Sequence, residues 1–205
     1  MKPILPITYF GNLEYYYRLM QSSGSATIQT HELYQKQTYR NRCYVMGANG
    51  ILNLSVPVER PNGKLTLTKD VLISNAENWR QVHWKTLESC YNRTPYFEFY
   101  ADQIKALIFA PNSKLKDLNI SLIKHIVDKI GLSVDIRMID SSDFGTEISQ
   151  KIAFNPKINS NFKGHHYLQT FTERYGFTDN LSILDLLFNE GPNSICILNE
   201  SKYEN

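Results

Sequence analysis

The chain has 205 residues, of which 42% are hydrophobic and 20% are charged, and its formal net charge is +2. This composition excludes a largely disordered chain, and the near-neutral charge disfavours a protein that binds nucleic acid. No apolar run reaches the roughly 18 residues of a membrane-spanning helix, and the N-terminal residues lack the pattern of a signal peptide.

The first thirty residues predict a strand, a helix and a second strand. Residues 4–10 have a composition typical of a strand. After a break at residues 21–25, residues 26–30 also have the composition of a strand. Between the two strands, side chains fall at helical spacing at Leu13, Tyr16, Tyr17 and Met20. This order predicts a parallel βαβ unit. Further along, residues 51–58 and 65–74 predict a hairpin, with a Pro-Asn-Gly turn between them.

The middle of the chain predicts three helices, over residues 79–91, 95–109 and 115–130. In the third helix one apolar stripe is expected, formed by Leu118, Leu122, Ile126 and Ile130. Residues 133–139 then predict another strand. Residues 140–163 are polar and lack periodicity, which is typical of an irregular excursion or a lid-like loop.

Taken together, these elements predict an α/β fold. We expect a single domain over residues 1–205, with a mostly parallel, Rossmann-like sheet, flanking helices and an added hairpin. The three cysteines, Cys43, Cys90 and Cys196, are widely spaced and predict free thiols in a reducing cytoplasm, without a metal site. Common phosphate-loop, serine-hydrolase and zinc-protease motifs are absent from the sequence, and no particular cofactor is indicated.

The segment KQTYRNRC, residues 36–43, is the strongest candidate for a ligand site. If it is extended, alternation places Lys36, Arg40 and Arg42 on one face, with the two arginines about 7 Å apart. Two guanidinium groups at that separation can hold a phosphate or pyrophosphate. Asn41 then faces the other way. The alternative is a charged edge strand that prevents aggregation.

Three other places in the chain carry polar side chains with a candidate role. His83 shares a helix face with Trp79 and could act as a general base, or it could be a boundary residue with its hydrogen bonds satisfied. The segment around His166 and Gln169 could reach a pocket, or be a polar connection. Asp185 lies among apolar residues at helical spacing, so it should be partly buried and needs a hydrogen-bonding partner.

Several segments, in their order along the chain, resemble the WbqC-like protein family, in particular its bacteroidete-type members. They are PITYF, ELYQKQTYRNRC, LNLSVPV, WRQVHWKTLESCYNRTPYFEFY, YLQTFTERYGF and NLSILDLLFNEGP. Positions that match the family's motifs are Arg40, Asn41, Arg42, His83, Trp84, Tyr167, Gln169, Phe171, Asp185 and Asn189. The start of the chain departs from the family, because Lys2-Pro3-Ile4-Leu5-Pro6 lacks a Gln and an aromatic residue found in many relatives.

The family is named for genes of O-antigen clusters and has no assigned reaction. The resemblance therefore implies a cytoplasmic protein of lipopolysaccharide or other surface-polysaccharide biosynthesis. Transfer of an acyl or aminoacyl group to a nucleotide- or phosphate-bearing amino sugar is the reaction that we expect. A non-catalytic scaffold protein of a glycan-biosynthesis complex is the alternative.

On the transferase hypothesis the expected partner is a small anionic molecule such as a sugar nucleotide. The residues expected to be catalytic are His83, Tyr91 and Tyr167. Those expected to bind the ligand are Lys36, Arg40, Asn41, Arg42, Trp84, His166, Gln169, Asp185 and Asn189.

Overall fold

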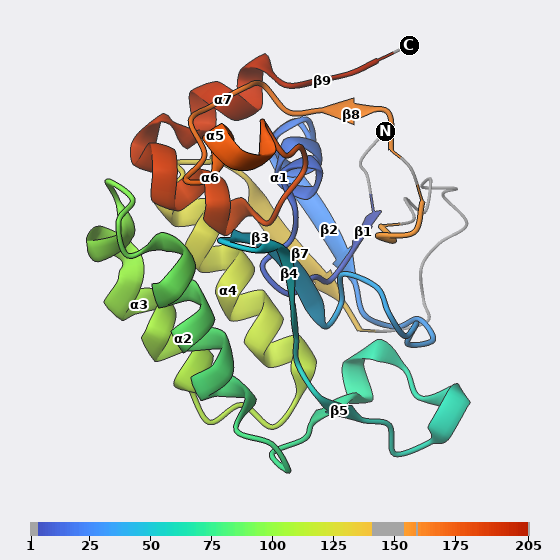
Figure 1. The fold of residues 1–205 in the computed structure, drawn as a ribbon. Helices are drawn as coiled ribbons and strands as arrows, with labels where there is room; N and C mark the ends of the chain where they lie inside the picture. Colours follow the sequence, from blue (N-terminus) through green and yellow to red (C-terminus); the bar gives the residue numbers. More distant parts are fainter. Residues whose placement is uncertain (1–3, 141–153, 159, 205) are drawn as a thin grey trace.

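The computed structural model describes residues 4–140, 154–158 and 160–204. A three-stranded parallel sheet lies at one side of the fold (Figure 1). Its strands, in spatial order, are β1 (Ile4–Pro6), β2 (Ser25–Gln29) and β7 (Asp135–Ile139). Helix α1 (Leu13–Met20) connects β1 to β2, and the two strands pair in parallel. The predicted βαβ unit is therefore confirmed.

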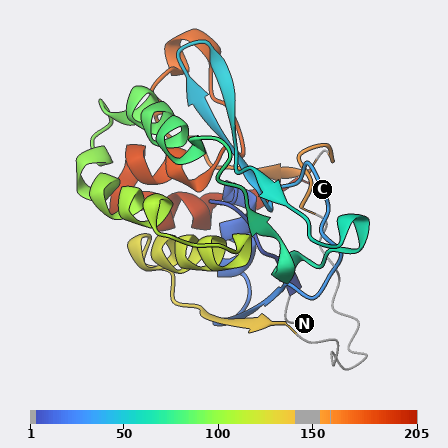
Figure 2. The ribbon, with the colours of Figure 1, turned by 90° about the horizontal axis from the view of Figure 1, so that it is seen from below.

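Six further α-helices belong to the described residues. They are α2 (Trp79–Tyr91), α3 (Phe97–Phe109), α4 (Leu115–Lys129), α5 (Thr172–Tyr175), α6 (Ile183–Glu190) and α7 (Ser194–Glu200), with short 3₁₀ turns at Gly63–Leu65, Thr68–Asp70 and Gly191–Asn193. Helices α2, α3 and α4 run side by side along one flank (Figures 1 and 2). The predicted stripe of α4 is confirmed, because Leu118, Leu122, Ile126 and Ile130 are all buried.

The other strands of the described residues form antiparallel pairs. They are β3 (Arg42–Gly47) with β4 (Gly50–Ser55), β5 (Val58–Glu59) with β6 (Leu72–Ile73), and β8 (Phe162–Lys163) with β9 (Lys202–Tyr203). A mixed α/β fold is thus confirmed, but a full Rossmann-like sheet is not. The physical reason is the short connection at residues 48–49, which permits only antiparallel pairing of its flanking strands.

The added hairpin exists, but its strands differ from those predicted. Residues 51–55 pair with β3, the strand before them, and only Val58–Glu59 pairs with the later segment at Leu72–Ile73. The turn at Ala48-Asn49 closes the hairpin, which projects beside α5 (Figure 2). The Tyr175 hydroxyl of α5 donates to the Ala48 carbonyl at 3.0 Å and ties the two together.

The prediction of an extended segment over residues 36–43 is wrong for its first six residues. Residues 36–41 form turns, and β3 begins only at Arg42. Local hydrogen bonds stabilise the turns: the Thr38 hydroxyl donates to the Gln35 carbonyl at 3.0 Å, and Gln37 adopts a left-handed backbone with φ of 58°. Strand alternation therefore does not apply to Lys36 and Arg40.

The core is one continuous cluster of buried apolar side chains that joins the sheet, the hairpin and the helices. A single domain over residues 1–205 stays a prediction, and the continuous cluster is consistent with it. Of the predicted excursion at 140–163, residues 141–153 and 159 lie outside the described residues, and β8 ends the segment. None of the described helices is both long and apolar enough to cross a membrane.

Helix α6 ends at Gly191, which has a left-handed φ of 52° and lies against the ring of Tyr96. A Cβ atom at this position would overlap the ring, and the left-handed backbone adds strain. We expect Gly191→Ala to lower the free energy of unfolding by about 2–4 kcal/mol in urea titrations. Gly131→Ala is the matched control, since φ is 69° there but the space is open; its cost should stay near 1 kcal/mol. Equal losses would contradict the packing explanation.

Candidate functional site

Arg40 is a structural residue of the loop between β2 and β3. Its side chain is buried and forms an ion pair with Glu32, with Nε donating to Glu32 Oε1 at 3.1 Å. A further donor, Nη1, contacts the Thr38 hydroxyl at 3.2 Å. The Arg40 carbonyl in turn accepts from Asn119 Nδ2 on α4 at 2.7 Å. The guanidinium donors of Arg40 therefore already bind other side chains of the protein.

Arg42 faces a different space from Arg40. Together with Lys36 and Arg60 it lines a cavity of about 390 Å³, which we call the basic pocket. The other lining residues are Tyr34, Gln37, Asn41 and Val58. Among the described residues no carboxylate forms an ion pair with any of these three cations, and the buried Arg42 Nε has no hydrogen-bond partner. An unpaired cluster of like charge favours an anionic ligand.

Asn41 and Tyr34 are two of the neutral polar residues that line the basic pocket. Asn41 Nδ2 donates to the Val56 carbonyl at 2.9 Å, which joins the loop to the end of β4, while its buried Oδ1 has no partner among the described residues. Burial raises the pKa of Tyr34 to about 12, although the nearby arginines oppose that shift. The Tyr34 hydroxyl therefore keeps its proton at neutral pH and can donate to an anion.

Arg60 is a residue of the basic pocket that the sequence reasoning missed. It follows β5, eighteen positions after Arg42 in the numbering. Val58 of β5 lines the same cavity, so the short β5–β6 pair carries Arg60 to the pocket. No local pattern marks this contact, because it depends on where β5 packs.

A buried hydrogen-bond network surrounds the carboxylate of Asp185, and we call it the Asp185 cluster. Its other members are Tyr91, Tyr167 and Gln169. The Tyr91 hydroxyl donates to Asp185 Oδ1 at 3.0 Å, and the Tyr167 hydroxyl donates to Oδ2 at 2.6 Å. Gln169 Nε2 also donates to Oδ2, at 3.0 Å. Asn189 Nδ2 donates to the Asp185 backbone carbonyl at 2.7 Å, one turn along α6.

The Asp185 cluster has no access to solvent through Tyr91 or Asp185, which are fully buried. Burial raises the pKa of Asp185, and the three donors oppose this shift. Burial likewise raises the pKa values of Tyr91 and Tyr167 well above the ordinary value of tyrosine. These groups therefore stabilise the packing of α2 and α6, while a catalytic role for the two tyrosines stays a prediction.

His83 lies in α2, away from the basic pocket. Its Nδ1 is 2.9 Å from the Tyr9 hydroxyl. Burial lowers the pKa of His83 to about 4, so the ring is neutral at pH 7. It borders a separate cavity of about 330 Å³ between α2 and β4. His83 and the three cations therefore line different cavities, and a catalytic role for His83 stays a prediction.

The last two predicted residues also lie apart from the basic pocket. Trp84 is buried and stacks on Phe97, with ring centroids 5.9 Å apart. His166 is exposed and stacks on Phe177, with ring centroids 4.1 Å apart. The structure thus brings Lys36, Asn41 and Arg42 together at one place, and the Asp185 cluster at another.

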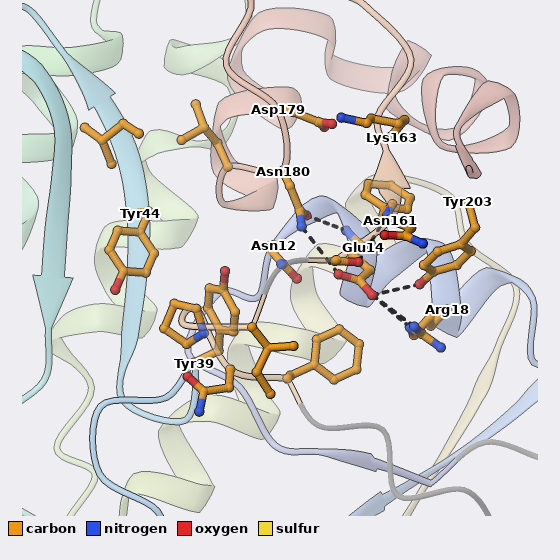
Figure 3. Close-up of a pocket in the computed structure, with 18 residues that line it drawn as sticks. Asn12, Glu14, Arg18, Tyr39, Tyr44, Asn161, Lys163, Asp179, Asn180 and Tyr203 are labelled. Atoms are coloured by element: carbon orange, nitrogen blue, oxygen red, sulfur yellow. Dashed lines mark hydrogen bonds and ion pairs between the residues drawn. The ribbon is translucent and has the colours of Figure 1, made fainter. Parts of the chain in front are cut away.

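A larger cavity, of about 840 Å³, lies between α1, β3 and the segments 154–158, 160–163 and 179–181; we call it the central cavity (Figure 3). Asn12, the N-cap of α1, and Glu14 in its first turn point into this region, with Tyr39 and Tyr44 at one side and Arg18 and Tyr203 at the other. No predicted site residue lines it. Its parts are distant in sequence, which is why no motif marked it.

Comparison with known proteins agrees with the resemblance noted in the sequence. The profile of the WbqC-like protein family matches residues 8–172. The chain belongs to the WbqC-like protein family.

A relative within the curated proteins is the uncharacterized protein Rv1507c of Mycobacterium tuberculosis. It is 27% identical over 112 residues, which are 54% of this chain and 47% of that protein. The matched region thus spans about half of the relative's length. No solved structure matches this chain. The family match covers both the basic pocket and α2, but ends before α6.

The hydrogen bond from Tyr167 to Asp185 generates a stability prediction. Tyr167→Phe removes one donor from a buried carboxylate, and we expect a loss of about 1–3 kcal/mol in the free energy of unfolding. Tyr175→Phe is the matched control, because that hydroxyl is bound at the surface to Ala48, and its loss should cost under about 1 kcal/mol. Urea titrations at pH 7 give both values. Equal stability of wild type and Tyr167→Phe would contradict a structural role for the cluster.

The lowered pKa of His83 predicts a pH dependence of stability. The folded state, with a pKa of about 4, binds fewer protons than an unfolded chain with the ordinary histidine value of 6.5. The contribution is therefore fully present above pH 6.5 and is lost as the pH falls towards 4, by about 3 kcal/mol in total. Urea titrations between pH 7 and 4 should show a smaller decline for His83→Gln than for wild type. Parallel declines would refute this prediction.

Proposed function

We propose that this chain binds a phosphate-bearing small molecule in the basic pocket. The observation that supports this proposal is the meeting of Lys36, Arg42 and Arg60 around one cavity, with no carboxylate partner among the described residues. Lys36 is exposed and the two arginines are half-buried, so the three like charges repel one another around the cavity unless an anion compensates them. Arg42 offers a guanidinium fork whose buried Nε still needs an acceptor.

We further propose that the bound molecule is an intermediate of surface-polysaccharide biosynthesis in the cytoplasm. Membership in a family named for O-antigen genes supports this assignment. The reaction that fits best is transfer of an acyl or aminoacyl group to the amine of an amino sugar that carries a nucleotide or phosphate. In this reaction the amine nitrogen forms an amide bond, the bond to the acyl carrier breaks, and the amine proton leaves with the carrier or to a base.

The basic pocket would hold the substrate's phosphate and would not supply the base. Tyr34 keeps its proton at neutral pH, and the other described lining residues are cations, amides and one valine. This composition also favours the second candidate function, a non-catalytic protein that presents a phosphate-bearing sugar to other enzymes of a glycan pathway. Incubation with an acyl donor and a nucleotide-linked amino sugar, followed by mass spectrometry, separates the two: an acylated product supports the transferase.

Calorimetric titration tests anion binding at the basic pocket. We expect pyrophosphate and a nucleoside diphosphate to bind the wild type, and Arg42→Ala and Arg60→Ala each to weaken that binding by roughly 10- to 100-fold, because each variant loses a charge-assisted hydrogen bond. Arg137→Ala is the matched control, since that exposed arginine pairs with Asp135 on β7 and lines none of the cavities described above.

Binding in Arg137→Ala should equal that of the wild type. Unchanged binding in both Arg42→Ala and Arg60→Ala would overturn the proposed site. Circular dichroism of each variant establishes that it is folded. Arg40→Ala differs from these variants: it breaks a buried ion pair, so instability of the protein is the expected result.

A further inference from the structure

The central cavity lies where open α/β sheets bind ligands. It adjoins the loop that follows the carboxyl end of β1, and Asn12 in that loop is the N-cap of α1. Ligands of such sheets bind in the crevice beyond the carboxyl ends of the strands. The volume of about 840 Å³ lies within the range of small-molecule sites.

Charge is balanced around this cavity. Arg18 pairs with the buried Glu14 carboxylate at 3.0 Å, and the Tyr203 hydroxyl donates to the same carboxylate at 2.8 Å. Figure 3 shows the carboxylate of Asp179 pointing toward the Lys163 ammonium across the upper rim. Each cation thus faces an anion, in contrast to the basic pocket. An anionic ligand would gain little here, whereas a neutral ligand with many hydroxyl groups loses nothing.

The remaining lining residues are amides and aromatic rings. The amide side chains come from Asn12, Asn155, Asn161 and Asn180. Asn161 is exposed and points its side chain into the cavity region (Figure 3). An amide offers both donors and an acceptor, which matches the two-way hydrogen bonding of a hydroxyl group.

Aromatic rings stand at opposite sides of the cavity. Tyr39 and Tyr44 pack edge to face on one side, with centroids 6.0 Å apart, and both are partly exposed. Phe162 and Tyr203 lie on the other side, 5.6 Å apart. The apolar face of a sugar ring packs on such rings while its hydroxyl groups reach polar side chains.

We infer that the central cavity binds an uncharged sugar ring. The ligand of the central cavity is uncharged, whereas the ligand of the basic pocket is an anion. Amide and tyrosine side chains would hold the sugar ring without an unpaired cation. This inference deepens the proposed function, in which the bound sugar also carries a phosphate. The sugar site itself does not require the basic pocket.

Strand β3 connects the two sites. Arg42 lines the basic pocket and Tyr44 lines the central cavity, and alternation along the strand puts both side chains on one face about 7 Å apart. One molecule could therefore place its phosphate at Arg42 and its sugar ring beside Tyr44. Such a molecule should bind more tightly than either half alone.

Saturation-transfer NMR with phosphate-free sugars tests the inference. The probes are methyl glycosides of hexoses and of N-acetylhexosamines at about 10 mM, a concentration suited to millimolar affinity. At least one of them should receive saturation from the wild type. Tyr44→Ala and Asn161→Ala should each reduce that signal at least threefold, because a stacking ring or an amide is lost.

Two control variants separate this site from the basic pocket. Tyr175→Ala removes a partly exposed tyrosine that does not line the cavity, and it should leave the signal unchanged. Arg42→Ala should also leave it unchanged, while it weakens pyrophosphate binding. If no probe receives saturation from folded wild type, or if Tyr44→Ala leaves the signal intact, the sugar site is refuted, whatever the outcome for pyrophosphate.

Discussion

The buried carboxylate of Asp185 is the constraint on which the arrangement of the helices depends. A carboxylate without solvent must receive hydrogen bonds, and its donors are Tyr91 of α2 and two residues of the segment before α5, Tyr167 and Gln169. The Tyr91 hydroxyl also accepts from the Met46 backbone N–H at 3.3 Å, which extends the network to β3. One buried carboxyl group therefore joins the hairpin, α2 and α6, and it lines neither proposed ligand site.

The two arginines of the loop before β3 show how neighbouring residues of one type can differ in role. Arg40 has its donors satisfied by Glu32 and Thr38, so it stabilises the loop. Arg42 begins a strand, and its direction is set by the pairing of β3 with β4. Arg40 stabilises this loop, and in the resulting conformation Lys36 and Arg42 line the same cavity. Stability and ligand binding are thus divided between residues two positions apart.

The two proposed sites lie along the same face of β3 and differ in charge. Near Arg42 the cations are unpaired among the described residues, and near Tyr44 the lining cations face carboxylates. Electrostatic contrast over such a short distance allows one surface to orient a ligand that has a charged and an uncharged part. The hairpin is well suited to this role because its backbone hydrogen bonds hold Arg42 and Tyr44 in a fixed register.

The sequence by itself determined the local elements: the βαβ unit, the helices with their apolar stripes, and the family. It also indicated that Asp185 needs a partner and that residues 36–43 carry an unusual concentration of cations. Which strand pairs with which, which arginine is free, and the presence of Arg60 and the central cavity were decided by the tertiary structure. The physical reason is range. Periodicity and turn chemistry act within a few residues, whereas ion pairs and cavities join segments that are distant along the chain.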